Sequence, residues 1–388
     1  MEDNKKTKKN RKVRHFYKKK NIKKNYKFWD TQLVPPFNEE MPIKLGPIKT
    51  DFKEEDLKKE PYELPENMEW VDIDITKEEE LDKVYEFLHV NYLESMEYKE
   101  QYNKEFLRWQ FSPIKNNKYK NILISIQINK TIIGFFSGLP MKLSVYDKEI
   151  TVYNISFLCI DKEYRKNKKH NLAEIMFKEM FRRTYMENVY QNIFVSKRLI
   201  PRPFSESTYY YIIFGDLPEI KEETTMKFRP MEKKDVKSVT KLLYENQKKY
   251  KIHSIFSEEE VEHWFIPIKN VIYSFVKEDN NGNITDFTSF YKIDANIDNE
   301  DENWSYIYFS IATSMSSKEL IENAIILSKQ NGMDCYICNT IMDYEKVCKK
   351  LKFHSNIEDE NSYGSLKYYF NNFICPETEA SDISLILI

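Results

Sequence analysis

One order of apolar segments occurs twice in this 388-residue sequence, and this duplication constrains the fold more than any other feature. Each half begins with a short strand pattern, continues with an amphipathic helix pattern and then shows the two strand patterns of a β-hairpin. The segments cover 69–75, 81–88 and 122–136 in the first half, and 227–231, 236–243 and 271–291 in the second. The sequence therefore predicts two related α/β modules, with a boundary near the charged segment 219–225.

Turn and cap residues support this assignment of strands and helices. A short polar pair between two strand patterns is typical of a tight hairpin turn, and Ser, Thr or Asp before an apolar run is typical of a helix cap. The predicted turns are Asn129-Lys130 and Asn281-Gly282, and the predicted caps are Thr76 (with Glu79) and Asp235.

A basic loop separates the strand pattern over 151–160 from an amphipathic helix that begins near Asn171. A helix N-terminus carries unpaired backbone N–H groups and the positive end of the helix dipole, so it is suited to hold a phosphate-bearing ligand such as acyl-CoA. The loop cations that would assist are Arg165, Lys166, Lys168 and Lys169. The alternative is that these side chains are simply solvated, and the loop by itself does not decide between the two.

Several common catalytic centres find no support in the sequence. The six histidines show no zinc spacing, no G-x-S-x-G elbow occurs, and seven glycines provide neither a Walker loop nor a dinucleotide fingerprint. Cys335 and Cys338 form a C-x-x-C without a second pair, inside a segment that predicts a core strand. We therefore expect no metal, no cofactor and reduced cysteines.

Charge is segregated along the chain, although the net charge is only −2. Residues 1–25 form a Lys-rich and Asn-rich tail that has almost nothing to bury, so we expect it to be disordered. The opposite end is the apolar run Leu385–Ile388, which we expect to dock on the folded body. No apolar stretch approaches the roughly 20 residues of a membrane span and no signal-peptide core is present, so we expect a cytoplasmic protein.

A series of short stretches occurs in the order in which one known family carries them. They are Tyr26 and Phe28-Trp29-Asp30-Thr31-Gln32 with Val34-Pro35, Glu60-Pro61-Tyr62, Glu105-Phe106-Leu107 with Trp109, Phe157-Leu158-Cys159, Arg229-Pro230-Met231-Glu232, residues 259–265, Thr285-Asp286-Phe287 with Ser289-Phe290-Tyr291, and Leu351-Lys352-Phe353 followed by Gly364, Leu366, Tyr368 and Tyr369. Over 26–388 the chain resembles the eukaryotic glycylpeptide N-tetradecanoyltransferases, or N-myristoyltransferases. The resemblance implies two fused acetyltransferase-like (GNAT) modules that share a continuous saddle-shaped sheet. It also implies an acyltransferase that moves myristate from coenzyme A to an N-terminal glycine.

The resemblance further implies a domain arrangement and an acyl-CoA site. The tail would cover 1–25, an N-terminal module with the acyl-CoA site would cover 26–218, and a C-terminal module that contributes to the peptide site would cover 219–388. Myristoyl-CoA would be a substrate, with no resident cofactor. The residues expected to contact it are Tyr26, Lys27, Phe28, Trp29, Leu158, Cys159, Ile160, Arg165, Lys166, Lys168, Lys169, Leu172 and Ala173.

The catalytic groups implied by the resemblance belong to the main chain. The backbone amides of Phe157 and Leu158 would form the oxyanion hole, where two fixed N–H donors stabilise the developing charge by several kcal/mol. The terminal carboxylate of Ile388 would be the base that deprotonates the glycine ammonium. A free α-carboxylate has a pKa of about 3.5, and the glycine ammonium has a pKa of about 8. Burial therefore has to bring these two pKa values closer together.

The peptide site is the part where the sequence departs from the family pattern. The residues expected to contact the peptide are Tyr92, Glu94, Tyr98, Tyr102, Tyr209, Gly364 and Leu366. The departures are Ser156, Val195, Lys197, Ala295 and Ile337, at positions where the family has other residue types. The acyl donor is therefore better supported than the peptide preference.

Two other functions remain open from the sequence. A GNAT-like N-acetyltransferase that uses acetyl-CoA would share the basic loop and helix but would not need the segment 26–32. A nucleic-acid-binding or ribosome-binding protein would use the tail, in which His15, Phe16 and Tyr17 interleave with lysines. We expect a monomer whose partners are myristoyl-CoA and proteins with an N-terminal glycine, with RNA or ribosome contact confined to the tail.

Overall fold

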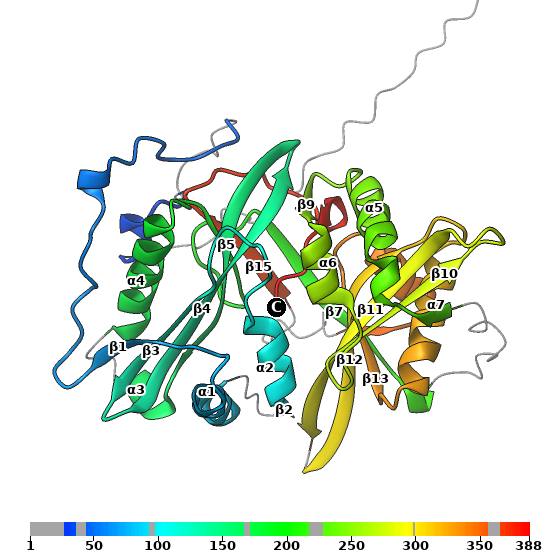
Figure 1. Ribbon diagram of the computed structural model, residues 1–388, viewed down its shortest axis with the longest axis horizontal. Coiled ribbons are helices and arrows are strands. Elements are labelled where there is room, and N and C mark those ends of the chain that lie inside the picture. Colours follow the sequence, from blue (N-terminus) through cyan, green and yellow to red (C-terminus); the bar gives the residue numbers. More distant parts are fainter. Residues whose placement is uncertain are drawn as a thin grey trace, which may run out of the picture.

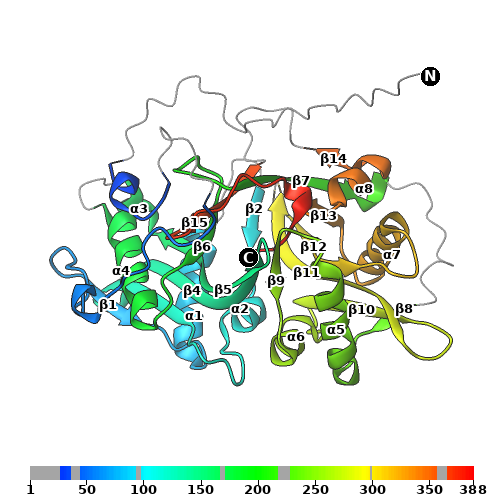
Figure 2. The ribbon, with the colours of Figure 1, turned by 90° about the horizontal axis from the view of Figure 1, so that it is seen from above.

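The computed structural model describes residues 27–35, 44–92, 98–166, 171–216, 228–297, 299–355 and 365–388. The basic tail and the predicted boundary at 219–225 lie outside these ranges, so both stay predictions. Figure 1 shows two α/β halves beside one another, and Figure 2 shows the C-terminus between them. The predicted mixed α/β fold with one continuous sheet is confirmed.

The first half is built in the order that the sequence predicts. Its elements are β1 (Glu69–Asp72), α1 (Glu78–Asn91), β2 (Tyr98–Gln101), α2 (Lys104–Phe111), β3 (Ile122–Ile128), β4 (Thr131–Val145), β5 (Lys148–Ile160), α3 (Lys162–Lys166), α4 (Leu172–Met186), β6 (Asn192–Ser196) and β7 (Ser205–Ile213). The pairs β1–β3, β3–β4 and β4–β5 are antiparallel, and β5–β6 is parallel.

The second half repeats the same pairing. Its elements are β8 (Phe228–Pro230), α5 (Val236–Gln247), β9 (Ile252–Ile255), α6 (Glu258–Phe265), β10 (Ile272–Glu278), β11 (Ile284–Ile297), β12 (Glu300–Ile311), α7 (Ser317–Gln330), β13 (Cys335–Asn339), α8 (Tyr344–Lys350), β14 (His354–Ser355), β15 (Ser365–Asn371) and β16 (Ile383–Ser384). Here β8–β10, β10–β11 and β11–β12 are antiparallel and β12–β13 is parallel. The structure therefore contains the duplication that the sequence predicts.

An exchange of strands joins the two halves. β15, from the end of the chain, lies between β6 and β7 of the first half and is antiparallel to both. β7, from the first half, is antiparallel to β13 of the second. The sheet order is accordingly β1-β3-β4-β5-β6-β15-β7-β13-β12-β11-β10-β8 over the described residues, without a break at the junction.

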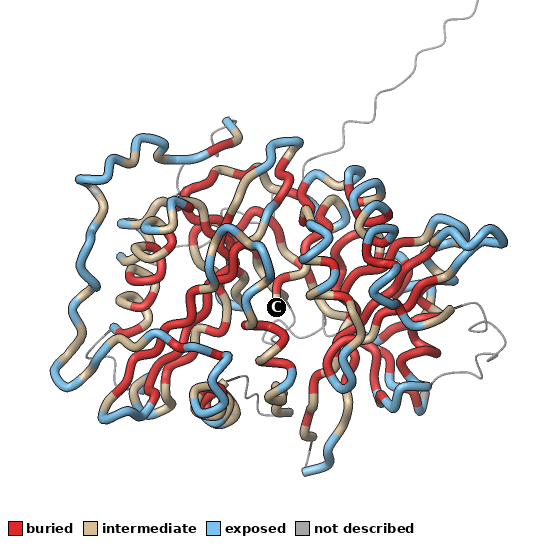
Figure 3. The backbone as a smooth tube through the Cα atoms, in the orientation of Figure 1, coloured by how far each residue is buried: buried red, intermediate tan, exposed pale blue. Residues whose placement is uncertain are grey.

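The helices bury apolar faces against this sheet, and Figure 3 shows the buried residues concentrated along the strands. Met176 and Met180 of α4 are fully buried over β4. A Cβ on Gly138 would lie 2.8 Å from the Met180 sulfur, so any other residue there would force the Met180 side chain to move. No helix within the described ranges is long and apolar enough to cross a membrane.

Both predicted hairpins are confirmed, and their turn residues explain them. Asn129 and Lys130 have φ angles of 49° and 67°, the left-handed pair that a two-residue turn between twisted strands requires. Gly282 has φ of 80° between β10 and β11. β4 extends beyond the predicted run because it continues past Pro140 and pairs with β5 from Gly134 to Val145.

Three local predictions are wrong. The cap of α1 is Lys77 and not Thr76, because the Asp74 carboxylate accepts hydrogen bonds from the Thr76 amide (3.1 Å) and hydroxyl (2.6 Å) and holds that residue in a turn. α5 does begin directly after Asp235, but the Asp235 carboxylate binds Arg229 and the Glu232 amide and does not cap the helix. The start of the basic loop is the short helix α3.

Candidate active site

β5 and β6 separate in the middle of the first-half sheet. Their parallel pairing begins at Tyr153 opposite Asn192 and ends at Ile155 opposite Phe194. Both strands are described in full and both continue beyond this point, but they pair no further. The sheet consequently has an opening beside the last residues of β5.

A β-bulge lies at this opening. The register between β4 and β5 shifts there, so that Phe157 and Leu158 together oppose the single residue Phe136. Phe157 has φ of 54°, a left-handed conformation that phenylalanine rarely adopts. A bulge interrupts the ladder of backbone hydrogen bonds, so this segment has main-chain donors that the sheet does not use. The structure thus brings the two residues of the predicted oxyanion hole to the opening.

Aromatic packing holds the bulge in this conformation. The Phe157 ring is buried and stacks on Tyr92, with centroids 5.3 Å apart, and it meets Tyr102 and Phe111 edge-on at 5.2 and 4.9 Å. An unfavourable backbone conformation persists only where its surroundings impose it. The direction of the bulge amides is therefore fixed by side chains from α2 and from the chain between α1 and α2.

The side of the bulge towards α3 is apolar and chemically inert. Cys159 and Ile160 are buried at the end of β5. Burial raises the pKa of the Cys159 thiol to about 12, although the charge of Arg165 opposes this shift. The thiol stays protonated and is a poor nucleophile. Cys159 is therefore part of an apolar wall beside the bulge and is not a reactive group.

The N-terminus of α4 lies beyond this wall. Asn171 precedes the helix in a left-handed conformation and makes no side-chain capping bond. Its carbonyl accepts from the Glu174 and Ile175 amides at 2.9 and 3.3 Å, so the amides that the helix leaves for an anion are those of Leu172 and Ala173. Arg165 is exposed and donates to the Asn91 carbonyl at 3.0 Å, which ties α3 to the end of α1. Lys166 is exposed, whereas Lys168 and Lys169 lie outside the described residues. Phosphate binding here stays a prediction.

The segment that contains Phe28 and Trp29, before β1, packs on α4 and β6. The Trp29 ring lies 5.2 Å from that of Phe177 and stacks on Phe194 at 5.6 Å. Phe28 contacts Trp29 at 5.0 Å, so the predicted acyl-CoA contacts 28 and 29 are held near Leu172 and Ala173 of the same helix. Lys27 is exposed, and Tyr26 lies outside the described residues.

Tyrosines line the other side of the bulge. Tyr102 follows β2 and lies 6.0 Å from Tyr92, centroid to centroid. Tyr209 of β7 meets Tyr306 of β12 at 6.1 Å. Leu366 is half-buried on β15 and pairs with Ser207. Of the other predicted peptide contacts, Glu94 and Gly364 lie outside the described residues, as does the side chain of Tyr98 at the start of β2.

A carboxylate that the sequence did not single out lies among these tyrosines. Glu100 of β2 accepts a hydrogen bond of 2.6 Å from the Tyr306 hydroxyl. Burial raises the pKa of Glu100, and the Tyr306 hydrogen bond and the charge of Lys197 oppose that shift. Glu100 is opposite Ala295 on β11, one of the positions where the sequence departs from the family pattern.

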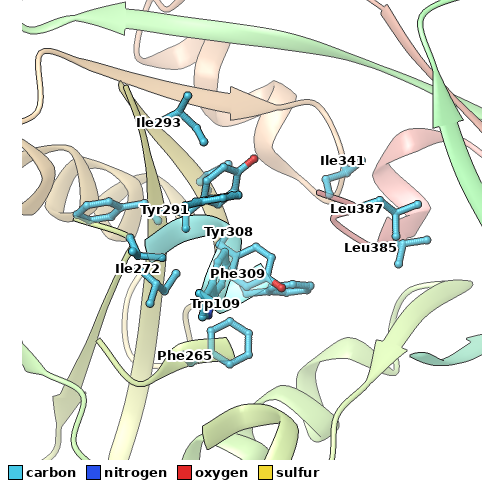
Figure 4. Close-up of a cluster of buried hydrophobic side chains, with 14 of the residues drawn as sticks. Trp109, Phe265, Ile272, Tyr291, Ile293, Tyr308, Phe309, Ile341, Leu385 and Leu387 are labelled. Carbon is cyan, nitrogen blue, oxygen red and sulfur yellow. The ribbon is translucent and has the colours of Figure 1, made fainter. Parts of the chain in front are cut away.

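The end of the chain docks at the junction of the two halves. β16 is parallel to β9, and β9 is antiparallel to β4 of the first half. Figure 4 shows Leu385 and Leu387 beside Ile341, in the apolar cluster that also contains Tyr308. Ile388 is half-buried and lines a small cavity together with Asn154 of β5. The predicted docking of the terminus is confirmed.

Two family descriptions match the chain in succession. The N-terminal domain of myristoyl-CoA:protein N-myristoyltransferase matches residues 47–207, and the C-terminal domain matches 213–384. A glycylpeptide N-tetradecanoyltransferase of Plasmodium falciparum is 34% identical over 95% of this chain and 95% of its own length, and one of Danio rerio is 31% identical over 94% and 78%. The chain belongs to the N-myristoyltransferase family.

The structural comparison agrees with this assignment. A crystal structure of Saccharomyces cerevisiae N-myristoyltransferase with bound myristoyl-CoA superposes with a TM-score of 0.83 at 25% identity, covering 94% of this chain and all of that one. The GNAT-like acetyl-CoA alternative is therefore not favoured. No group of three or more metal-ligating side chains occurs among the residues that the structure describes.

The Tyr306 hydroxyl of β12 binds Glu100 of β2, and the charge of Lys197 at the end of β6 acts on the same carboxylate; sequence reasoning missed this association. Glu100 stands between Tyr98 and Tyr102, a pattern that also occurs in exposed strands and therefore does not predict burial of the carboxylate. Only the pairing of β2 with β11 buries it. The departure at Lys197 was the one available signal that the charges near the peptide site had changed.

Proposed function

We propose that this protein transfers a myristoyl group from myristoyl-CoA to the amino group of an N-terminal glycine. The observation that carries the proposal is the bulge at Phe157 and Leu158, which lies where β5 and β6 separate. Main-chain donors thus meet an opening through which an acyl group and an amine can approach each other. Membership of the N-myristoyltransferase family supports the identity of both substrates.

The reaction forms a C–N bond and breaks a C–S bond. The glycine nitrogen attacks the thioester carbon, and the carbonyl oxygen gains negative charge that the amides of Phe157 and Leu158 stabilise. Collapse of the intermediate breaks the C–S bond, and the proton that the attacking nitrogen still carries in excess passes to the coenzyme A thiolate, which gives the amide and the free thiol. The apolar wall at Cys159 and Ile160 keeps water from competing with the amine.

The base in this proposal is the α-carboxylate of Ile388. The buried side chains of Leu385 and Leu387 fix the segment, and β16 anchors it to β9. Burial raises the pKa of a carboxylate and lowers that of an ammonium, so a shared site narrows the difference between them. The proton moves from the glycine ammonium to the carboxylate before the attack on the thioester.

The first prediction concerns the substrates. With myristoyl-CoA, we expect transfer to a peptide that begins with Gly and not to the same peptide beginning with Ala, because a β-carbon would crowd an amine held against the thioester. Mass spectrometry of the peptide measures the product. Acetyl-CoA is the donor control and should react at least about tenfold more slowly, a difference of about 1.4 kcal/mol. Equal use of the Ala peptide would contradict the proposal.

The second prediction concerns the base. Two residues added after Ile388 displace the carboxylate by several Å, at about 3.3 Å per residue, which is beyond hydrogen-bond reach. Turnover should fall by about 10² or more, because general-base catalysis contributes 10²–10⁴, while the affinity for myristoyl-CoA stays unchanged. Calorimetry and single-turnover kinetics separate the two quantities. An extended chain with normal turnover would exclude the Ile388 carboxylate.

The tail, the compartment and the oligomeric state are further parts of the proposal. Residues 1–25 would contact RNA or the ribosome through their positive charge and would take no part in acyl transfer. RNA binding by the full chain and by a chain without residues 1–25, measured at two salt concentrations, tests the role of the tail.

We also propose that the protein is a cytoplasmic monomer. Sedimentation measures its oligomeric state, and cell fractionation shows its compartment.

A further inference from the structure

The separation of β5 and β6 places a cation across from the bulge. The last pair of the ladder is Ile155 with Phe194, and Leu158 and Lys197 each follow three residues further along the chain, after the two strands have separated. Lys197 directly follows Ser196, where β6 ends beside β15. Lys197 is thus carried by the strand that borders the opening across from β5.

Glu100 relates this lysine to the bulge, because its carboxylate senses the Lys197 charge and it lies among the tyrosines that pack on Phe157. The carboxylate of Glu100 is held by the Tyr306 hydroxyl at 2.6 Å and feels the charge of Lys197. Glu100 also lies close enough to Tyr92 and Tyr102 to influence both phenols. These two rings pack on Phe157, so the two opposite charges border one small region beside the reacting groups.

We propose that Lys197 promotes the acyl transfer electrostatically and that Glu100 moderates its charge. The inference rests on the proposed myristoyl transfer. In this arrangement the Lys197 ammonium disfavours a second positive charge on the glycine nitrogen and favours negative charge on the thioester oxygen. Lys197 is exposed, so its effect depends on the peptide excluding water from the opening. Glu100 acts through Lys197 and is a positioning residue.

The other titratable groups around the opening do not compete for this role. Burial raises the pKa values of Tyr92, Tyr102, Tyr291 and Tyr306, so these phenols stay neutral. Cys159 is neutral for the same reason. On β15, Lys367 is bound by Glu206 at 3.1 Å and by the Ser365 hydroxyl at 2.6 Å. The terminal carboxylate is the proposed base.

The sign of the pH effect is the same whichever group titrates in the acid limb of the profile. A nearby cation lowers the pKa of the glycine ammonium, because like charges repel, and lowers the pKa of the terminal carboxylate, because opposite charges attract. Removing the cation therefore moves the acid limb of kcat against pH to higher pH. Removing the negative charge of Glu100 has the opposite effect on both groups and moves the limb to lower pH.

The test uses two nearly isosteric, uncharged substitutions, Lys197→Met and Glu100→Gln, in the full chain with saturating myristoyl-CoA and a Gly-initiated peptide. We expect Lys197→Met to move the acid limb up by about 0.5–1 pH unit, less than a fully buried charge pair would produce. Its plateau rate should also fall several-fold. Glu100→Gln should move the limb down. Lys197→Arg keeps the charge and should retain the wild-type limb.

Lys99→Met is the matched control, because Lys99 is the neighbour of Glu100 on β2 and points to the opposite face of that strand. It should leave the profile unchanged. An unchanged acid limb in Lys197→Met, or shifts of the two variants in the same direction, overturns the inference, whereas a merely structural pair produces no opposite shifts. If the wild-type protein acylates no glycine peptide at all, the proposed function fails instead.

Discussion

At the scale of single residues, Glu179 shows how this fold places charge inside. Its side chain on α4 is fully buried and accepts hydrogen bonds from Arg182 (2.7 and 2.9 Å), from Arg183 (2.8 Å) and from the Tyr62 amide (3.0 Å). Arg182 also donates to the Lys59 carbonyl at 2.8 Å. One carboxylate therefore fastens the segment before β1 to the helix that covers the proposed acyl-CoA site.

We predict that Glu179→Gln lowers the free energy of unfolding by roughly 3–5 kcal/mol near pH 7, because it leaves two partly buried guanidinium groups without their counter-charge. Burial alone would raise the pKa of Glu179, but the hydrogen bonds from Arg182, Tyr62 and Arg183 outweigh it and the pKa is lowered. A lowered pKa stabilises the fold above the unfolded-state value of 4.5 and ceases to do so as the pH falls through the folded-state value.

The difference between wild type and variant should therefore shrink as the pH falls below about 4.5, the ordinary value for a glutamate. Urea unfolding at several pH values measures it. Glu86→Gln, an exposed substitution on α1, is the control and should change stability by less than about 0.5 kcal/mol. A constant difference over the whole pH range would show that Glu179 packs without acting as an anion.

At the scale of elements, the turn of the β3–β4 hairpin contains a residue whose replacement should stabilise the protein. Lys130 is exposed with φ of 67°, a conformation that costs an L-residue about 1–2 kcal/mol and costs glycine little. Lys130→Gly should therefore raise the free energy of unfolding by roughly 0.5–1 kcal/mol, since glycine loses part of the gain through its greater freedom when unfolded. Lys130→Ala is the control and should give no gain. If both variants unfold at the wild-type temperature, the left-handed conformation of Lys130 costs no measurable stability and the prediction is wrong.

The same elements show what the sequence could and could not predict. Local chemistry predicts the hairpin turns, the order of strands and helices and the docked terminus, because each depends on residues that are close together in the sequence. The bulge does not, because nothing in the residue type of Phe157 favours a left-handed conformation, and only Tyr92, Tyr102 and Phe111 impose it. Its role was therefore available through family resemblance alone. Glu100 was missed because its burial depends on a strand that is distant in sequence.

At the scale of the whole molecule, the strand exchange makes the two halves inseparable. β15 of the second half lies between β6 and β7 of the first, and β7 pairs with β13. We predict that a chain cut between residues 216 and 228, at an inserted protease site, still elutes as one particle and unfolds in one transition. Separation requires the loss of the six strand pairings that join the two fragments, β2–β11, β4–β9, β7–β13, β7–β14, β6–β15 and β7–β15, and of the apolar surface that they cover. Size-exclusion chromatography and calorimetry of the cut and uncut chains test this, and two separate elution peaks would contradict it.

The exchange also orders events during synthesis of the protein. Translation delivers β6 and β7 long before β15, so for most of that time the first half has two strand edges with no partner between them. Every element that could bind the acyl donor is then already made, yet the sheet around it is incomplete. A ribosome that stopped before Ser365 would release a chain lacking both the joining strand and the Ile388 carboxylate. Under the proposed mechanism a truncated product would lack the base and could not acylate a glycine, and its open strand edges would expose it to quality control.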